Sequence, residues 1–157
     1  PMATDSTKPD LHLEMVSQPR LLAAARTMVG TVAQRLGFDE LECGQISLAV
    51  DEALCNIIKH GYAGRDDGRI WVSIWCMDGP LGLHILIEDE AEQIDPESIR
   101  SRDLDDIRPG GLGVYIIREV MDDVVYERRD GSTGMRLRLR KHLPSESEAM
   151  TRSESTS

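Results

Sequence analysis

Two pairs of strands joined by tight turns constrain the fold of this chain most. Within residues 70–77 the side chains alternate between two faces, one of them apolar, as expected for a strand with one buried face. Asp78-Gly79-Pro80 provides the turn to the next strand, and Asp130-Gly131 provides a second hairpin turn. Strands joined by so few residues pair antiparallel, because a parallel pair needs a long crossover connection. These four strands are predicted at residues 70–77, 83–89, 124–128 and 135–141.

The predicted helices are grouped and do not separate every pair of strands. A strand at residues 11–16 is followed directly by two helices, and a third helix precedes the last hairpin. Pro19 fits the first turn of the first helix, and Gly37 fits the position just past its end. Asp39, with Glu42 three residues later, predicts the capping box that begins the second helix. The helices are predicted at residues 19–36, 40–60 and 112–121, and the loop at 90–109 has room for one short helix.

This order of elements excludes a doubly wound parallel sheet, which requires strict alternation of strands and helices. It predicts an α+β fold, a two-layer sandwich in which helices cover one face of a mixed, mostly antiparallel sheet. We expect one domain at residues 10–143, because a chain of 157 residues suits a single core. Residues 1–9 and the acidic Ser/Thr tail at 144–157 are polar and lack periodicity, so both are predicted to be disordered.

The composition limits the class of function. A formal net charge of −10 argues against general affinity for nucleic acids or anionic membranes, so any bound phosphate needs local N–H groups and a metal ion. No apolar run reaches the roughly 18 residues of a membrane span, and no secretory signal is recognised. The three cysteines lie far apart without a CxxC pair, which is typical of reduced thiols. We therefore expect a cytoplasmic protein.

The second predicted helix carries a polar stripe. At about 100° per residue, Glu52, Asn56 and His60 line up along its axis, and an apolar face lies opposite. A carboxylate in this stripe can accept a proton from a hydroxyl nucleophile, and an amide oxygen beside it can bind Mg²⁺, which prefers oxygen ligands. The spacing alone favours a solvated helix face, since a glutamate and an asparagine four residues apart are common.

Two further features are compatible with a bound ligand. Asp89 ends a strand whose inward residues are otherwise aliphatic, so its carboxylate continues a buried face and needs a partner such as a ligand amine. A solvated position just past the sheet would explain it as well. Residues 108–115, which read RPGGLGVY, run from a loop into the third helix, where glycines and free helix N–H groups can cradle a phosphate. The alternative is a plain helix start, and the segment is neither a Walker A loop nor a Rossmann fingerprint.

The order of these features resembles the GHKL, or Bergerat-fold, ATPases. Residues 51–62, which read DEALCNIIKHGY, resemble the N box of the RsbW-type anti-sigma factor serine kinases. Residues 89–91 (DEA) occupy the place of the G1 box, and residues 110–113 (GGLG) resemble the G2 box. The resemblance covers about residues 11–142, nearly all of the chain that we expect to be ordered.

The resemblance implies a role for each matching residue. Glu52 would be the general base, the one catalytic residue, and Asn56 would bind Mg²⁺. Asp89 would recognise the adenine amine, His60 would support the edge of the pocket, and residues 90–110 would form a short lid over ATP. The nucleotide-binding residues would be Asn56, His60, Asp89, Ala91, Arg108, Gly110, Gly111, Leu112, Gly113 and Val114.

The resemblance also implies partners. A kinase of this type would use ATP and Mg²⁺ to phosphorylate a serine of a STAS-domain anti-anti-sigma factor, would sequester a sigma factor, and would act as a homodimer without contacting nucleic acid or membrane directly. Two departures keep a second interpretation open: Ala91 stands where the family usually has glycine, and Met135 stands where threonine often follows the glycine. The second interpretation is a binding module that uses ATP poorly and acts by sequestration alone. A third, the catalytic domain of a sensor histidine kinase, is disfavoured by the short lid.

Overall fold

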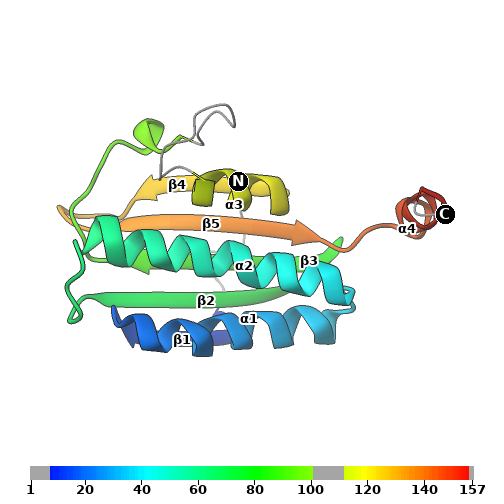
Figure 1. Cartoon of the computed structure of the whole chain (residues 1–157), viewed down its shortest axis with the longest axis horizontal. Helices are drawn as coiled ribbons and strands as arrows, with labels where there is room; N and C mark the ends of the chain where they lie inside the picture. Colours follow the sequence, from blue (N-terminus) through cyan, green and yellow to red (C-terminus); the bar gives the residue numbers. More distant parts are fainter. Residues whose placement is uncertain (1–7, 101–111, 156–157) are drawn as a thin grey trace.

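The computed structural model describes residues 8–100 and 112–155 of the chain. Helices α1, α2 and α3 lie over one face of a sheet, and α4 lies beyond the end of β5 (Figure 1). The elements in chain order are β1 (Leu11–Val16), η1 (Pro19–Leu21), α1 (Leu22–Leu36), α2 (Glu40–Asn56), η2 (Ile57–Gly61), β2 (Arg69–Asp78), β3 (Leu81–Asp89), η3 (Pro96–Ser98), α3 (Leu112–Val120), β4 (Asp123–Arg128), β5 (Met135–His142) and α4 (Glu146–Glu154).

The sheet has five strands in the order β1-β2-β3-β5-β4, and every neighbouring pair is antiparallel. The predicted hairpins β2–β3 and β4–β5 are both present, which confirms the α+β two-layer fold. The sheet is fully antiparallel in the described residues, whereas the prediction allowed a mixed sheet. After β3 the chain passes through η3 and α3 before β4, and β5 then returns to pair with β3.

The core lies between the helices and the sheet face that they cover. The cross-strand register places Ile74 of β2 beside Ile85 of β3, and Ile85 beside Leu139 of β5. Because side chains alternate along a strand, the residues two positions away face the same helices. The core side chains with no more than 1% exposure include Ala25, Val29, Ile46, Val50, Leu54, Ile70, Ile74, Leu83, Ile85, Ile87, Ile117 and Leu139.

The two long helices begin and end where local chemistry predicts. Gly37 follows α1 with a φ of 108°, a left-handed conformation that glycine adopts readily. Asp39 caps α2: its carboxylate accepts a hydrogen bond from the Glu42 N–H at 2.7 Å, and the Glu42 carboxylate accepts one from the Asp39 N–H at 3.1 Å. Both hydrogen bonds of the predicted capping box are therefore present.

The end of the second helix differs from the prediction. We expected one continuous helix at residues 40–60, but α2 ends at Asn56 and the chain continues as the π-helical turn η2. A π turn holds more residues than an α turn, so Lys59 and His60 no longer follow the α-helical stripe that contains Glu52. Both side chains are exposed.

The C-terminal segment also differs from the prediction. We expected a disordered tail at 144–157, but the structure has α4 there, so this prediction was wrong for that helix. Ser145 caps α4 by accepting a hydrogen bond from the Glu148 N–H at 3.4 Å, and the Glu148 carboxylate accepts one from the Ser145 N–H at 2.9 Å. Arg152 forms an ion pair with Glu42 of α2 at 3.1 Å. Composition misses such a local cap and an ion pair with another helix.

Candidate functional site

A cavity of about 380 Å³ lies between the C-terminal end of α2, the turn η2, and the ends of β3 and β5. Its walls are mostly apolar, with a few polar side chains among them, as is usual for small-molecule sites. Five of the residues predicted to bind the nucleotide line this cavity together: Asn56, His60, Asp89, Ala91 and Val114. Residues far apart in the sequence are thus brought to one place, which the resemblance had implied.

Asp89 is the buried carboxylate of this cavity, with 4% of its surface exposed. Its Oδ1 accepts hydrogen bonds from the N–H groups of Ala91 at 2.9 Å and Met135 at 3.1 Å. Burial raises the pKa of Asp89, while these two hydrogen bonds and the charge of Arg129 oppose that rise. No hydrogen bond within the described residues uses Oδ2, so this atom is free to accept one from a ligand amine.

The β4–β5 hairpin holds the backbone that follows Asp89. Arg129 donates from Nη1 to the Asp89 carbonyl at 3.0 Å, and its guanidinium lies 4.9 Å from the centre of the Trp71 ring. The Gly134 N–H donates to the Ala91 carbonyl at 2.7 Å. Gly134 has a φ of 91°, and a Cβ added there would lie 2.3 Å from the Asp89 carbonyl oxygen, so only glycine fits. The backbone at Asp89 is therefore held by residues of the β4–β5 hairpin. Arg129, one of them, lies 40 positions after Asp89 in the sequence.

Tyr62 holds the same turn from the other side. Its hydroxyl donates to the Arg69 carbonyl and accepts a hydrogen bond from the Glu90 N–H at 2.8 Å. Burial raises the pKa of Tyr62, so the hydroxyl stays protonated and can serve both bonds at neutral pH. A Cβ added at Gly68 would lie 2.5 Å from the Tyr62 ring, which explains the glycine there. One side chain at the end of the N-box segment thus connects η2 to β2 and to the turn after β3.

Ala91 replaces the expected glycine without backbone strain. Ala63 is the one non-glycine residue with positive φ among residues 8–100 and 112–155, so the Ala91 backbone needs no glycine. Its methyl group packs near Gly61, where an added Cβ would lie 3.1 Å away. Ala91 and Met135 both line the cavity, so the two departures narrow it without closing it.

The start of α3 lies directly against the polar stripe of α2. A Cβ added at Gly113 would lie 2.7 Å from Oε2 of Glu52 and 3.4 Å from Nδ2 of Asn56. The lack of a side chain at Gly113 therefore lets the α3 backbone approach Glu52 and Asn56 closely without displacing them. The first N–H groups of a helix have no partner within it and attract anions, so this junction suits a phosphate.

Some of the predicted site residues line the cavity and others lie outside its wall. Glu52 is half-buried and does not line the cavity; it lies beside Gly113 at the junction of α2 and α3. Leu112 is exposed as the first residue of α3 and is also absent from the cavity wall. His60 lines the cavity from η2, and its role there stays a prediction. The predictions for Arg108, Gly110 and Gly111 lie outside the described residues.

Sequence reasoning missed three residues that shape the site. Tyr62 belongs to the N-box segment without a role of its own there, and Arg129 lies between a strand and a hairpin turn, where a charged residue gives no signal. Tyr126 lines the cavity from β4, together with Leu137 of β5. The alternation of inward residues along 124–128 could have indicated Tyr126, since Val124 and Tyr126 share a face.

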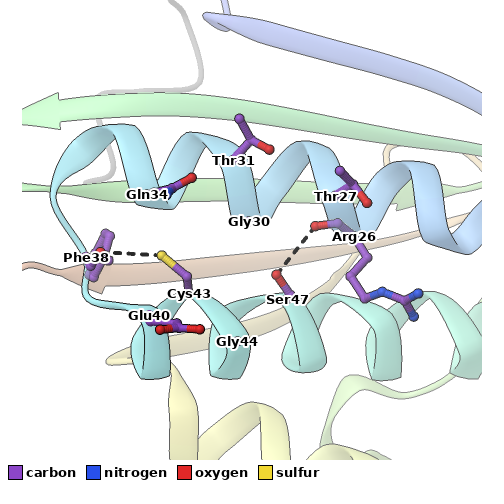
Figure 2. Close-up of a pocket in the computed structure, with 10 residues that line it drawn as sticks. All are labelled: Arg26, Thr27, Gly30, Thr31, Gln34, Phe38, Glu40, Cys43, Gly44 and Ser47. Carbon is purple, nitrogen blue, oxygen red and sulfur yellow. Dashed lines mark hydrogen bonds between the residues drawn. The ribbon is translucent and has the colours of Figure 1, made fainter.

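A second hollow lies elsewhere and holds none of the predicted residues. It measures about 580 Å³ and runs between α1 and α2, as Figure 2 shows. The helices approach closely there, since a Cβ added at Gly30 would lie 2.6 Å from Oγ of Ser47. Small residues such as Gly30 and Gly44 leave this hollow open along the helix pair. Although it is the larger of the two, none of the residues that line it is a buried polar side chain, whereas Asp89 is one in the first cavity.

Among residues 8–100 and 112–155, no group of three or more His, Cys, Asp and Glu side chains could by itself hold a metal ion. In the same part of the chain, no helix has the length and apolar character needed to cross a membrane.

Comparisons with known proteins agree with this geometry. A family described as the histidine kinase-like ATPase domain matches residues 15–141. The serine-protein kinase RsbW of Listeria monocytogenes is 30% identical over 130 residues, which cover 78% of this chain and 81% of the relative. The serine-protein kinase RsbW of Bacillus subtilis is 24% identical over 131 residues, with the same shares of both chains.

Two solved structures share the fold. The RsbU and RsbW domains of Rv1364c from Mycobacterium tuberculosis match 88% of this chain with a TM-score of 0.57 and 16% identity, and the match covers 34% of that longer chain. The histidine kinase domain of a blue-light activated kinase from Erythrobacter litoralis matches 78% of this chain and 61% of its own, with a TM-score of 0.51 and 20% identity. With the matched family and the RsbW relatives, these findings establish that the chain belongs to the histidine kinase-like ATPase family and is a protein kinase of the RsbW type.

Proposed function

We propose that the protein is an ATP-dependent serine kinase and anti-sigma factor that acts in the cytoplasm. It would phosphorylate a serine of a STAS-domain anti-anti-sigma factor and would sequester a sigma factor, so that phosphorylation controls the exchange of partners. The observation that carries the proposal is Asp89, a buried carboxylate with one free oxygen in a cavity shared with Asn56. The relatives named serine-protein kinases support serine as the acceptor.

The residues of the cavity fit ATP. Oδ2 of Asp89 can accept a hydrogen bond from the exocyclic amine of adenine, and the apolar side chains of Ile87, Leu137 and Val114 can pack against the ring. Gly113 has no side chain to hold a phosphate away from the α3 backbone, and the first N–H groups of a helix suit phosphate oxygens. A nucleotide can therefore be held at both ends by groups that the chain already positions.

The proposed chemistry needs little beyond positioning. ATP would supply the γ-phosphoryl group, and Mg²⁺ would neutralise charge on the phosphates. The Asn56 side-chain oxygen would bind the metal; one protein oxygen can suffice, because Mg²⁺ at nucleotide sites is bound largely by phosphates and water. Glu52 would accept the proton of the attacking serine hydroxyl. Its carboxylate lies beside the α3 terminus, so the base and the phosphate-binding backbone meet at one junction.

Calorimetric titration with ATP and Mg²⁺ tests the pocket. We expect micromolar binding by the protein and its loss in Asp89→Asn, because the asparagine amide would place a donor where adenine offers a donor. A thermal melt confirms that the variant is folded. If the unaltered protein shows no binding, or if Asp89→Asn binds equally well, the assignment of the nucleotide to this cavity is wrong.

Phosphate transfer tests the base. Glu52→Gln keeps the shape of the side chain but removes the proton acceptor, so we expect ATP binding to persist and transfer from labelled ATP to a STAS-domain protein to be lost. Glu40→Gln is a matched control, because it removes a carboxylate from the same helix about 18 Å away along the axis. Normal transfer by Glu52→Gln would show that Glu52 is not the base.

A second candidate function is favoured by Ala91 and Met135, which narrow the cavity. On this proposal the protein sequesters its partner without phosphorylating another. Millimolar or undetectable ATP affinity together with tight sigma-factor binding would favour it over the kinase.

We also propose that the protein is a homodimer. Sedimentation equilibrium measures its mass in solution, and the mass of a single chain would contradict this proposal.

A further inference from the structure

Tyr126 places a hydroxyl-bearing side chain in the wall of the nucleotide cavity. It lies in β4 opposite Leu137 of β5, and Leu137 in turn lies opposite Ile87 of β3. These three residues form one row across the sheet and all line the cavity. Tyr126 is therefore part of the surface on which the proposed nucleotide would lie, although no motif of the sequence includes it.

No hydrogen bond within residues 8–100 and 112–155 engages the Tyr126 hydroxyl. Burial raises the pKa of Tyr126 to about 12, opposed by the charge of Arg118, so the hydroxyl is protonated at neutral pH and can donate. The Arg118 guanidinium lies over the ring at 5.8 Å from its centre and stabilises it by a cation–π contact. Within the described residues, the Tyr126 hydroxyl is not one of the buried polar atoms that lack a partner, so a ligand acceptor in the cavity can reach it.

Neighbouring polar groups of the wall already have partners. Ser98 donates from Oγ to the Asp95 carbonyl at 2.6 Å, and Arg100 donates from Nε to the Glu97 carbonyl at 3.1 Å. Both contacts stabilise the segment around η3, which lies near β4. Of Ser98, Arg100 and Tyr126, only Tyr126 has no side-chain hydrogen bond to another described residue.

The sheet geometry indicates which part of a nucleotide Tyr126 would meet. Tyr126 lies two strands from β3, about 10 Å at the usual strand spacing, and its row is two residues, about 7 Å, from Asp89 along the strands. The two side chains therefore stand about 12 Å apart on the same face, since strand side chains project roughly perpendicular to the sheet. That distance exceeds the width of a purine held at Asp89, so the group that reaches Tyr126 is the sugar.

We propose that the Tyr126 hydroxyl donates a hydrogen bond to a ribose hydroxyl of the bound nucleotide, which makes Tyr126 a specificity-determining residue for ribonucleotides. The inference rests on the proposed binding of ATP at Asp89. It assigns to β4 a part in ligand recognition, next to the parts of α2, β3 and α3.

The test measures binding by calorimetry, so it does not depend on phosphate transfer. ATP, 2′-deoxy-ATP and 3′-deoxy-ATP are each titrated with Mg²⁺ into the unaltered protein, Tyr126→Phe and the control Tyr115→Phe. Tyr115 lies on α3 outside the cavity wall. A neutral hydrogen bond contributes about 0.5–1.5 kcal/mol, so we expect Tyr126→Phe to bind ATP about two- to tenfold more weakly.

The deoxy nucleotides separate recognition from a general loss of packing. The unaltered protein and Tyr115→Phe should each discriminate about two- to tenfold against at least one deoxy nucleotide, and Tyr126→Phe should bind that nucleotide and ATP equally. Discrimination that persists in Tyr126→Phe, or that is absent from the unaltered protein, overturns the inference and leaves the proposed kinase intact. If the unaltered protein does not bind ATP, both proposals fail.

Discussion

Gly134→Ala should destabilise both the fold and the nucleotide site. Gly134 has a φ of 91°, where a residue with a Cβ costs about 1–2 kcal/mol. The new Cβ would lie 2.3 Å from the Asp89 carbonyl oxygen and 2.8 Å from Cδ of Arg129. The first neighbour is backbone and has no alternative rotamer, so the hairpin must move away from β3.

That movement endangers two hydrogen bonds of the hairpin. The Gly134 N–H donates to the Ala91 carbonyl at 2.7 Å, and the Gly134 carbonyl accepts from the Arg129 N–H at 3.0 Å. With about 1 kcal/mol for each, the total reaches about 3–4 kcal/mol. At about 2–4 °C per kcal/mol for a domain of this size, the midpoint of thermal unfolding should fall by roughly 10 °C.

Gly131→Ala is the matched control for this substitution. Gly131 lies on the same hairpin with a φ of 103°, but nothing lies within 4 Å of an added Cβ. It should therefore cost only the backbone term, about 1–2 kcal/mol, and leave ATP affinity unchanged. Calorimetric melts and ATP titrations of the two variants check this. If Gly134→Ala and Gly131→Ala lower stability and ATP affinity equally, the proposed clash between a Cβ at residue 134 and the Asp89 carbonyl is refuted.

Three further substitutions follow from the same structure. Gly113→Ala would place a methyl group 2.7 Å from Glu52 Oε2, so phosphate transfer should fall at least tenfold while a thermal melt shows a folded protein. Asp39→Ala removes the cap that binds the Glu42 N–H and should cost about 0.5–2 kcal/mol in denaturant unfolding. Burial raises the pKa of Asp89, so the folded state binds its proton more tightly than the unfolded state. The free energy of unfolding relative to Asp89→Asn should therefore fall as pH rises through the window above the ordinary aspartate pKa. A difference that stays constant across that window would contradict this.

Local patterns in the sequence predicted the elements that depend on neighbours in the chain. The hairpin turns, the cap at Asp39 and the glycine after α1 are all present, because each depends on a few consecutive residues. Asp89 was placed at the edge of a buried face by alternation alone, and it is buried. Its two hydrogen bonds come from Ala91 and Met135, and only the first could be expected from the local sequence.

Sequence patterns do not predict which strands pair when they lie far apart in the chain. That β5 lies between β3 and β4 depends on which strand edges remain free once the helices are packed. The contacts of Arg129 with Asp89 and Trp71 follow from that order, so no spacing in the chain could reveal them. The π-helical turn η2 was missed because its residues continue an ordinary helical pattern.

The two departures from the family pattern have less effect on the proposed adenine site than their side chains suggest. Ala91 and Met135 both act on Asp89 through backbone N–H groups, which any residue except proline provides. The anchor for a ligand amine is thus independent of the methyl and thioether groups, which set only the width of the cavity. Gly134 differs, because its lack of a side chain is what lets Met135 approach Asp89. Affinity for adenine should therefore depend more on the glycine before β5 than on either residue that departs from the family.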